Sequence, residues 1–94
     1  MLSEAAALAA AANYLSETSG DGADSIRIYP EGAFVIDGVL VVPWNSRALL
    51  DDGDLDAELG GNPDIGVDLA TGQCRYLDLM ESFEYERRRN AGES

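Results

Sequence analysis

The strongest constraint on the fold is the dipeptide Asp37-Gly38, which lies between two apolar runs. Both residue types tolerate the positive φ angles of a type I′ turn, and such a turn joins antiparallel strands with the correct twist. The sequence therefore predicts a β-hairpin with strands at 33–36 and 39–44. The second strand is apolar almost throughout, as expected for a central strand buried on both faces. Pro43 has no N–H to donate, so it should mark the end of pairing or a bulge.

An alanine-rich segment near the start predicts a helix. Seven alanines lie among residues 5–12, which gives this segment a high intrinsic helix propensity. We expect the helix to run from Ser3 to Glu17, with Ser3 as its N-cap. Helical spacing places four residues on one apolar stripe: Leu8, Ala11, Ala12 and Leu15.

The remaining segments are short and separated by turn signals. Alternating or apolar runs predict strands at 25–29, 65–69 and 73–79. Short helical turns are expected at 47–50, capped by Asn45 or Ser46, and at 54–59, capped by Asp54. Residues 80–89 are compatible with a helix or an extended segment, and residues 90–94 should form a frayed tail.

Together these elements predict a single α+β domain over residues 1–94. An N-terminal helix (1–19) packs on a small, mainly antiparallel sheet of about five strands (25–79), as a two-layer sandwich. A helical-turn insertion occupies 46–60, and a C-terminal segment and tail occupy 80–94. The single cysteine, Cys74, excludes an intramolecular disulfide, and we expect it to be a small core residue in a strand.

The charge balance restricts the class of partner. The chain has 18 Asp and Glu residues against 6 Arg, with no Lys or His, for a net charge of −12. Such a surface repels nucleic acids and anionic membranes, whereas it attracts a cationic protein. A purely solubilising role is the alternative. No apolar run is long enough to span a membrane and the alanine-rich start lacks a basic region, so we expect a cytoplasmic location.

The segment from Asp51 to Asp68 carries seven acidic residues and no basic one. A calcium loop of the EF-hand type would require Gly at its sixth position and Glu at its twelfth. Counted from Asp52, these positions hold Ala57 and Pro63, so the calcium interpretation is disfavoured. Two interpretations stay open: a solvated loop, and an acidic face for a basic protein partner.

Two residues before this segment are candidates for either structure or binding. Trp44 is of the type most often found as a binding hot spot, although a Trp at a strand end is also commonly a core anchor. The core role is favoured here, with Asn45 available as a cap. Without His, Lys or a metal-ligand set, catalysis has few options, so we expect no enzyme activity, no cofactor and no metal ion.

The middle of the chain resembles the YrhB-like family of small bacterial proteins, also called immunity protein family 35. The resemblance covers about residues 39–72. Three segments carry it: Val41-Val42-Pro43-Trp44-Asn45-Ser46-Arg47-Ala48-Leu49-Leu50-Asp51-Asp52-Gly53-Asp54, Leu59-Gly60-Gly61-Asn62-Pro63-Asp64-Ile65 and Asp68-Leu69-Ala70-Thr71-Gly72. The family usually opens the central strand with Gly-Trp, where this chain has Val39-Leu40.

This resemblance implies a protein partner. Members of the family are commonly encoded beside polymorphic toxins, which they neutralise by direct binding, and others are linked to heat-shock chaperone activity. We therefore expect an immunity protein that binds a basic toxin domain through an acidic surface. The alternatives are a small chaperone and a nucleic-acid mimic that inhibits a DNA-binding protein. The expected partner-binding residues are Asp51, Asp52, Asp54, Asp56, Glu58, Trp44 and Asn45.

Overall fold

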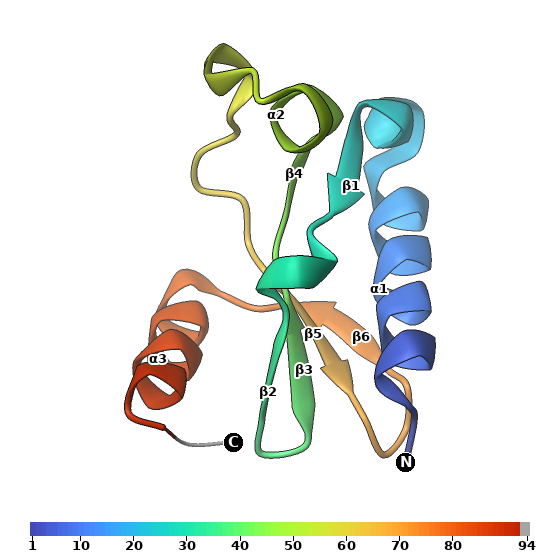
Figure 1. The fold of residues 1–94 in the computed structure, drawn as a ribbon. Helices are drawn as coiled ribbons and strands as arrows, with labels where there is room; N and C mark the ends of the chain where they lie inside the picture. Colours follow the sequence, from blue (N-terminus) through green and yellow to red (C-terminus); the bar gives the residue numbers. More distant parts are fainter. Residues whose placement is uncertain (93–94) are drawn as a thin grey trace.

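The computed structural model describes residues 1–92, which form three α-helices and six β-strands (Figure 1). The helices are α1 (Glu4–Ser19), α2 (Arg47–Asp52) and α3 (Leu79–Asn90). The strands are β1 (Ile26–Ile28), β2 (Phe34–Ile36), β3 (Val39–Val42), β4 (Trp44–Ser46), β5 (Ile65–Asp68) and β6 (Cys74–Tyr76). Short 3₁₀ turns are η1 (Gly20–Ser25), η2 (Pro30–Gly32) and η3 (Leu55–Ala57). The predicted α+β class is confirmed. Of the predicted tail, residues 93–94 lie outside the described part.

Helix α1 begins where the sequence predicts and packs with a slightly different face. The Ser3 hydroxyl accepts a hydrogen bond from the amide of Ala6, as expected for an N-cap. The buried stripe consists of Ala7, Ala11 and Leu15, at a strict spacing of four residues. Of the predicted stripe, Ala12 is exposed. Two small alanines in the stripe let the helix backbone approach the sheet closely.

Four strands form an antiparallel sheet in the order β2-β3-β5-β6. The predicted hairpin joins β2 to β3, and its turn residues Asp37 and Gly38 have φ angles of 52° and 74°. A second predicted hairpin joins β5 to β6. The central position of β3 explains why it is apolar: three of its four residues, Leu40, Val41 and Val42, are fully buried.

The predicted strand at 39–44 is wrong in its extent, because Pro43 divides it. Strand β3 ends at Val42, and β4 pairs with β1 in a separate two-stranded sheet. Pro43 cannot donate to a ladder, while its carbonyl accepts a hydrogen bond of 2.8 Å from the amide of Tyr29. The strands therefore form two antiparallel sheets, where the sequence suggested one sheet of about five strands.

Figure 1 shows α1 on one side of the four-stranded sheet and α3 on the other. Side chains on the α1 face form the main core, which includes Leu40, Val42 and Val67. The opposite face carries Val41, which is also fully buried. Helix α3 therefore adds cover on the second face to the two-layer arrangement that the sequence predicted.

Helix α3 is anchored to the β2–β3 hairpin by its basic end. Arg88 forms an ion pair of 2.6 Å with Asp37, and the Arg89 guanidinium lies 4.7 Å from the ring centroid of Phe34. Residues 80–89, for which the sequence allowed a helix or an extended segment, are therefore helical, and their basic end packs on the hairpin.

None of the helices within residues 1–92 is long and apolar enough to cross a membrane.

Candidate functional site

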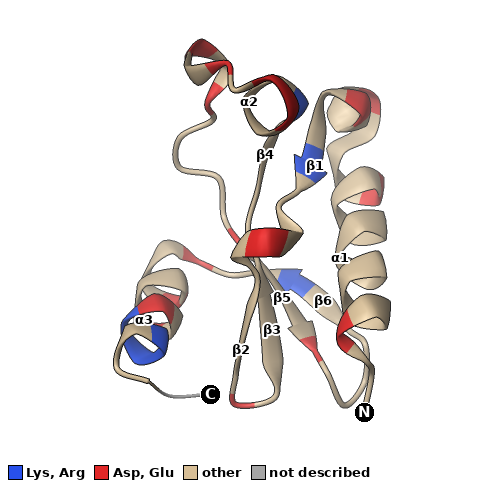
Figure 2. Ribbon diagram, viewed as in Figure 1, with Lys and Arg blue, Asp and Glu red and all other residues tan. Residues whose placement is uncertain are grey.

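The predicted acidic surface forms a distinct projection from the fold. We call residues 47–58, which contain α2 and η3, the acidic lobe. Figure 1 shows it at the end of the molecule beyond β1 and β4, away from the four-stranded sheet. Figure 2 shows acidic residues along this projection, with others on η1 and the end of α1 nearby. The structure brings five predicted residues together here, all of them exposed: Asp51, Asp52, Asp54, Asp56 and Glu58.

Two of these five carboxylates have structural partners. Asp51 forms an ion pair with Arg27, with an N–O distance of 2.8 Å. The Asp54 carboxylate caps η3 by accepting a hydrogen bond of 3.1 Å from the amide of Asp56. Within residues 1–92, the side chains of Asp52, Asp56 and Glu58 form no ion pair. These three carboxylates are available to a cationic partner.

An apolar side chain lies among these carboxylates. Leu55 is 76% exposed, although a leucine normally gains from burial. It occupies the first position of η3, between Asp54 and Asp56 in the sequence. The acidic lobe therefore exposes one large apolar side chain beside its carboxylates.

Ser46 connects the two halves of the acidic lobe. Its hydroxyl accepts a hydrogen bond of 3.1 Å from the amide of Leu49, which makes it the N-cap of α2. The same hydroxyl donates to the carbonyl of Ala57 at 2.7 Å. Ser46 is only 8% exposed, so both hydrogen bonds are shielded from water. One side chain thus fixes α2 relative to η3, and Ser46 is a structural residue of the lobe.

Asn45 holds the segment that leaves the lobe. Its side-chain carbonyl accepts hydrogen bonds of 2.8 Å from the amides of Ser46 and Leu59. Its side-chain amide donates to the carbonyl of Leu59 at 3.3 Å. All of these bonds are made inside the chain, which gives Asn45 a positioning role. Its contact with a partner stays a prediction.

Trp44 has the core position that the sequence favours. It is partly buried and packs against the main core. Its indole N–H donates to the carbonyl of Pro63 at 2.6 Å, and its own carbonyl accepts a hydrogen bond from the side chain of Asn62. Trp44 therefore connects β4 to the loop that returns from the acidic lobe.

Metal and thiol chemistry have little support in the described part of the chain. Among residues 1–92, no group of three or more His, Cys, Asp or Glu side chains is placed to hold a metal ion. Burial raises the pKa of the Cys74 thiol, and the charge of Glu17 raises it further. Cys74 is thus held as a neutral thiol that packs against the main core, as the sequence suggested.

Sequence reasoning missed a second surface, on α3. Leu79, Met80 and Phe83 are 64%, 74% and 55% exposed, and their spacing places them on one side of a helix. Next to them, a groove of about 310 Å³ lies between α3 and residues 61–64. The spacing of the three apolar residues was visible in the sequence. This spacing could not predict a shared surface while residues 80–89 were compatible with either a helix or an extended segment.

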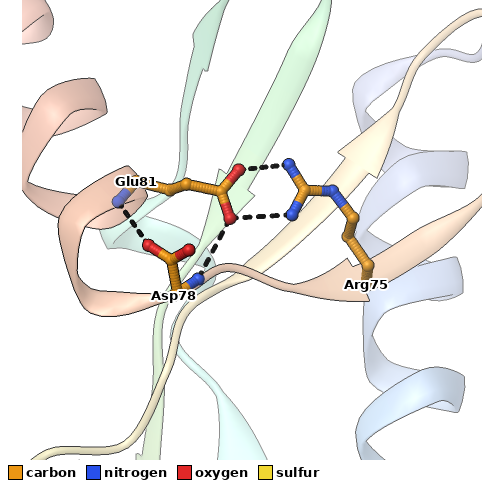
Figure 3. A network of polar contacts seen from close by, with 3 residues as sticks. All are labelled: Arg75, Asp78 and Glu81. Atoms are coloured by element: carbon orange, nitrogen blue, oxygen red, sulfur yellow. Dashed lines mark hydrogen bonds and ion pairs between the residues drawn. The ribbon is translucent and has the colours of Figure 1, made fainter.

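Arg75, Asp78 and Glu81 form a network at the start of α3 (Figure 3). The Asp78 carboxylate accepts a hydrogen bond of 2.8 Å from the Glu81 amide, and Glu81 accepts one of 3.2 Å from the Asp78 amide. This reciprocal pair is a capping box. Arg75 donates to the same Glu81 carboxylate at 2.9 Å. The network attaches the helix to β6.

We expect this network to make stability depend on pH in the acid range. Hydrogen bonds from Arg75 and the Asp78 amide lower the pKa of Glu81 from 4.5 to about 2. The ionised carboxylate therefore stabilises the fold above pH 4.5, and this contribution disappears as the pH falls toward 2. The Glu81→Gln variant should have a lower melting temperature at pH 7, and the difference from the parent protein should shrink by pH 2.

Thermal unfolding monitored by circular dichroism between pH 2 and pH 7 measures this difference. Glu31→Gln, on the exposed η2 turn, is the matched control, and it should differ from the parent protein by a small amount at every pH. If the melting temperature of Glu81→Gln stays below that of the parent protein by the same amount across the acid range, the role of the ionised Glu81 carboxylate is contradicted.

Neither a family model nor a curated protein nor a solved structure matches this chain.

Proposed function

We propose that this chain is an immunity protein that binds and neutralises a basic bacterial toxin domain through the acidic lobe. The observation that carries the proposal is that three exposed carboxylates of the lobe, Asp52, Asp56 and Glu58, form no ion pair within the described residues. The exposed Leu55 belongs to the same lobe. Burying unpaired like charges against a neutral partner is unfavourable, whereas a cationic surface would neutralise them.

The rigidity of the lobe supports the same function. Ser46 and Asn45 fix α2, η3 and Leu59 through hydrogen bonds to backbone groups. A surface that is already ordered loses less conformational entropy when a partner binds. Charge at such a surface also accelerates encounter with a cationic partner and competes with an anionic substrate for the same site. The resemblance to the YrhB-like family points in the same direction.

The proposal predicts that two lobe carboxylates contribute directly to binding. In the test, the chain is co-expressed with candidate toxins encoded by neighbouring genes, and bacterial growth and complex formation are measured. We expect growth to be rescued by a stoichiometric complex. Asp52→Asn together with Asp56→Asn should weaken that complex by about tenfold at low salt, because two charges opposite a cationic surface are lost.

The control removes the same number of charges elsewhere. Glu4→Gln together with Glu31→Gln changes two exposed carboxylates on α1 and η2, away from the lobe. The affinity of this variant for the partner should lie within about twofold of that of the parent protein, since only the overall electrostatic field changes. If both double variants weaken the complex equally, the lobe is not the contact surface. If no complex forms and growth is not rescued, the immunity function is wrong.

A chaperone function is the second candidate, and one observation favours it. Leu79, Met80 and Phe83 form an exposed apolar surface on α3, as a protein that holds unfolded clients requires. The discriminating measurement is light scattering of several unrelated, heat-denatured proteins in the presence of this chain. Suppression of aggregation for all of them, lost in Met80→Ser with Phe83→Ser, would favour the chaperone. No suppression would leave the immunity function as the better proposal.

A further inference from the structure

A groove between α3 and the loop at 61–64 has the chemistry of a binding site. The groove has a volume of about 310 Å³. Its polar lining includes Asp64, Ser82 and Glu86, and its apolar lining includes Pro63, Leu79 and Phe83. The two sides of the groove come from segments about twenty residues apart, which the fold brings together. Among residues 1–92, none that lines the groove is basic.

The two carboxylates of the groove, Asp64 and Glu86, form no ion pair among residues 1–92. Burial raises the pKa of Asp64 and the nearby Glu86 carboxylate raises it further, whereas a hydrogen bond with the Ser82 side chain lowers it. The Ser82 hydroxyl is buried, and its polar neighbour in the groove is the Asp64 carboxylate. Ser82 as a whole is 8% exposed. Two carboxylates beside a buried hydroxyl in one groove favour a ligand that is cationic and rich in hydrogen-bond donors.

The apolar lining narrows the choice of cation. Phe83 and Leu79 are 55% and 64% exposed, so a ligand in the groove would cover apolar surface that now contacts water. A guanidinium group is planar, carries five donors and stacks on an aromatic ring, whereas an ammonium group is compact and strongly hydrated. Two carboxylates beside a phenylalanine ring therefore match a guanidinium group better than an ammonium group.

We propose that this groove binds an arginine side chain of the partner protein, with its guanidinium between Asp64 and Glu86 and its aliphatic part against Phe83 and Leu79. The inference rests on the proposed function, since it assumes a basic protein partner. It adds a second contact, separate from the acidic lobe. The loop at 61–64 is fixed by Trp44 and Asn62, so the groove is ordered before the partner arrives.

The test uses a small probe and the complete chain. The ¹⁵N-labelled protein is titrated with N-acetyl-arginine N-methylamide at low salt, and amide chemical shifts are followed by NMR. We expect saturable shifts concentrated at residues 61–64 and 79–86. Asp64→Asn and Glu86→Gln should each weaken this binding by about fivefold or more, because a charge-assisted contact is lost. Asp52→Asn, a matched change in the acidic lobe, should change the affinity for the probe by no more than about twofold.

Two related probes decide the chemistry. The citrulline analogue has nearly the same shape without the charge, and it should give no saturable shifts in the groove. The lysine analogue should bind more weakly than the arginine analogue. Equal binding of citrulline, equal binding of lysine, or shifts concentrated in the acidic lobe would each overturn the proposal. Asp64→Asn and Glu86→Gln are nearly isosteric changes, so both variants should fold, and thermal melts check that they do.

The affinity of each double variant for the protein partner distinguishes this inference from the proposed function. If Asp64→Asn with Glu86→Gln leaves the affinity for the partner unchanged while Asp52→Asn with Asp56→Asn lowers it, the groove inference fails and the immunity function stands. If both double variants weaken the complex, both proposals are supported. If the groove binds the arginine probe but no protein partner is found, the proposal that a partner's arginine occupies the groove is wrong, and so is the immunity function.

Discussion

Replacing Leu40 with alanine is expected to lower the free energy of unfolding by about 3 kcal/mol. Leu40 is fully buried in β3, where it pairs with Val35 and Val67 across the sheet and lies in the core beneath α1. Helix α1 presents the small side chains of Ala7 and Ala11 to this core, and these two side chains are too short to fill the cavity. A domain of this size has a total stability of about 5–15 kcal/mol, so much of it would be lost.

Urea denaturation monitored by fluorescence measures this effect, because Trp44 is the single tryptophan of the chain and packs on the same core. Val35→Ala is the matched control. Val35 is the cross-strand partner of Leu40 and is 36% exposed on the edge strand, so its truncation should cost less than about 1 kcal/mol. Equal losses in the two variants would mean that the α1 face of the sheet is not packed as described.

The features that the sequence predicted correctly depend on local interactions. The Asp37-Gly38 turn is determined by two adjacent backbone conformations, and both residues have the required positive φ angles. Ser3, Ser46 and Asp54 cap helical segments that start directly after them. In each case the interacting groups are within three residues of one another, so sequence spacing alone was sufficient.

The features that the sequence left out depend on distant segments. Pairing of β4 with β1 joins residues 44–46 to residues 26–28, and nothing in either short segment specifies the other. Helix α3 was ambiguous because its apolar residues stay exposed, which removes the usual pattern of a buried stripe. The spacing of Asp78 and Glu81 is that of a capping box, and this signal would have predicted the helix.

The candidate site shows the same division. The exposure of the acidic lobe follows from its composition, because seven like charges within residues 51–68 cannot all be buried. The groove at α3 required knowledge of which loop contacts the helix, and the sequence contains no such signal. Charge composition thus identified one surface, while the second emerged only from tertiary contacts between residues 61–64 and α3.

Asn45 connects these two surfaces, because it follows Trp44 in β4 and holds Leu59, at the start of the loop that leads from the acidic lobe to the groove. The sequence made Asn45 a partner-binding candidate, whereas its amide group is occupied by bonds to the chain's own backbone. A residue with this geometry affects binding through the position of the lobe. Its substitution should therefore alter stability and local order before it alters any contact.

We expect Asn45→Ala to lower the free energy of unfolding by about 2 kcal/mol, because the amide of Leu59 and the amide of Ser46 lose their acceptor. Hydrogen exchange should accelerate at the Leu59 amide and along residues 57–62, while the β3–β5 ladder stays protected. Asn13→Ala, on the exposed side of α1, is the control, and it should be neutral or slightly stabilising because alanine has the higher helix propensity. If Asn45→Ala abolished partner binding with stability and exchange unchanged, Asn45 would be a contact residue, as the sequence suggested.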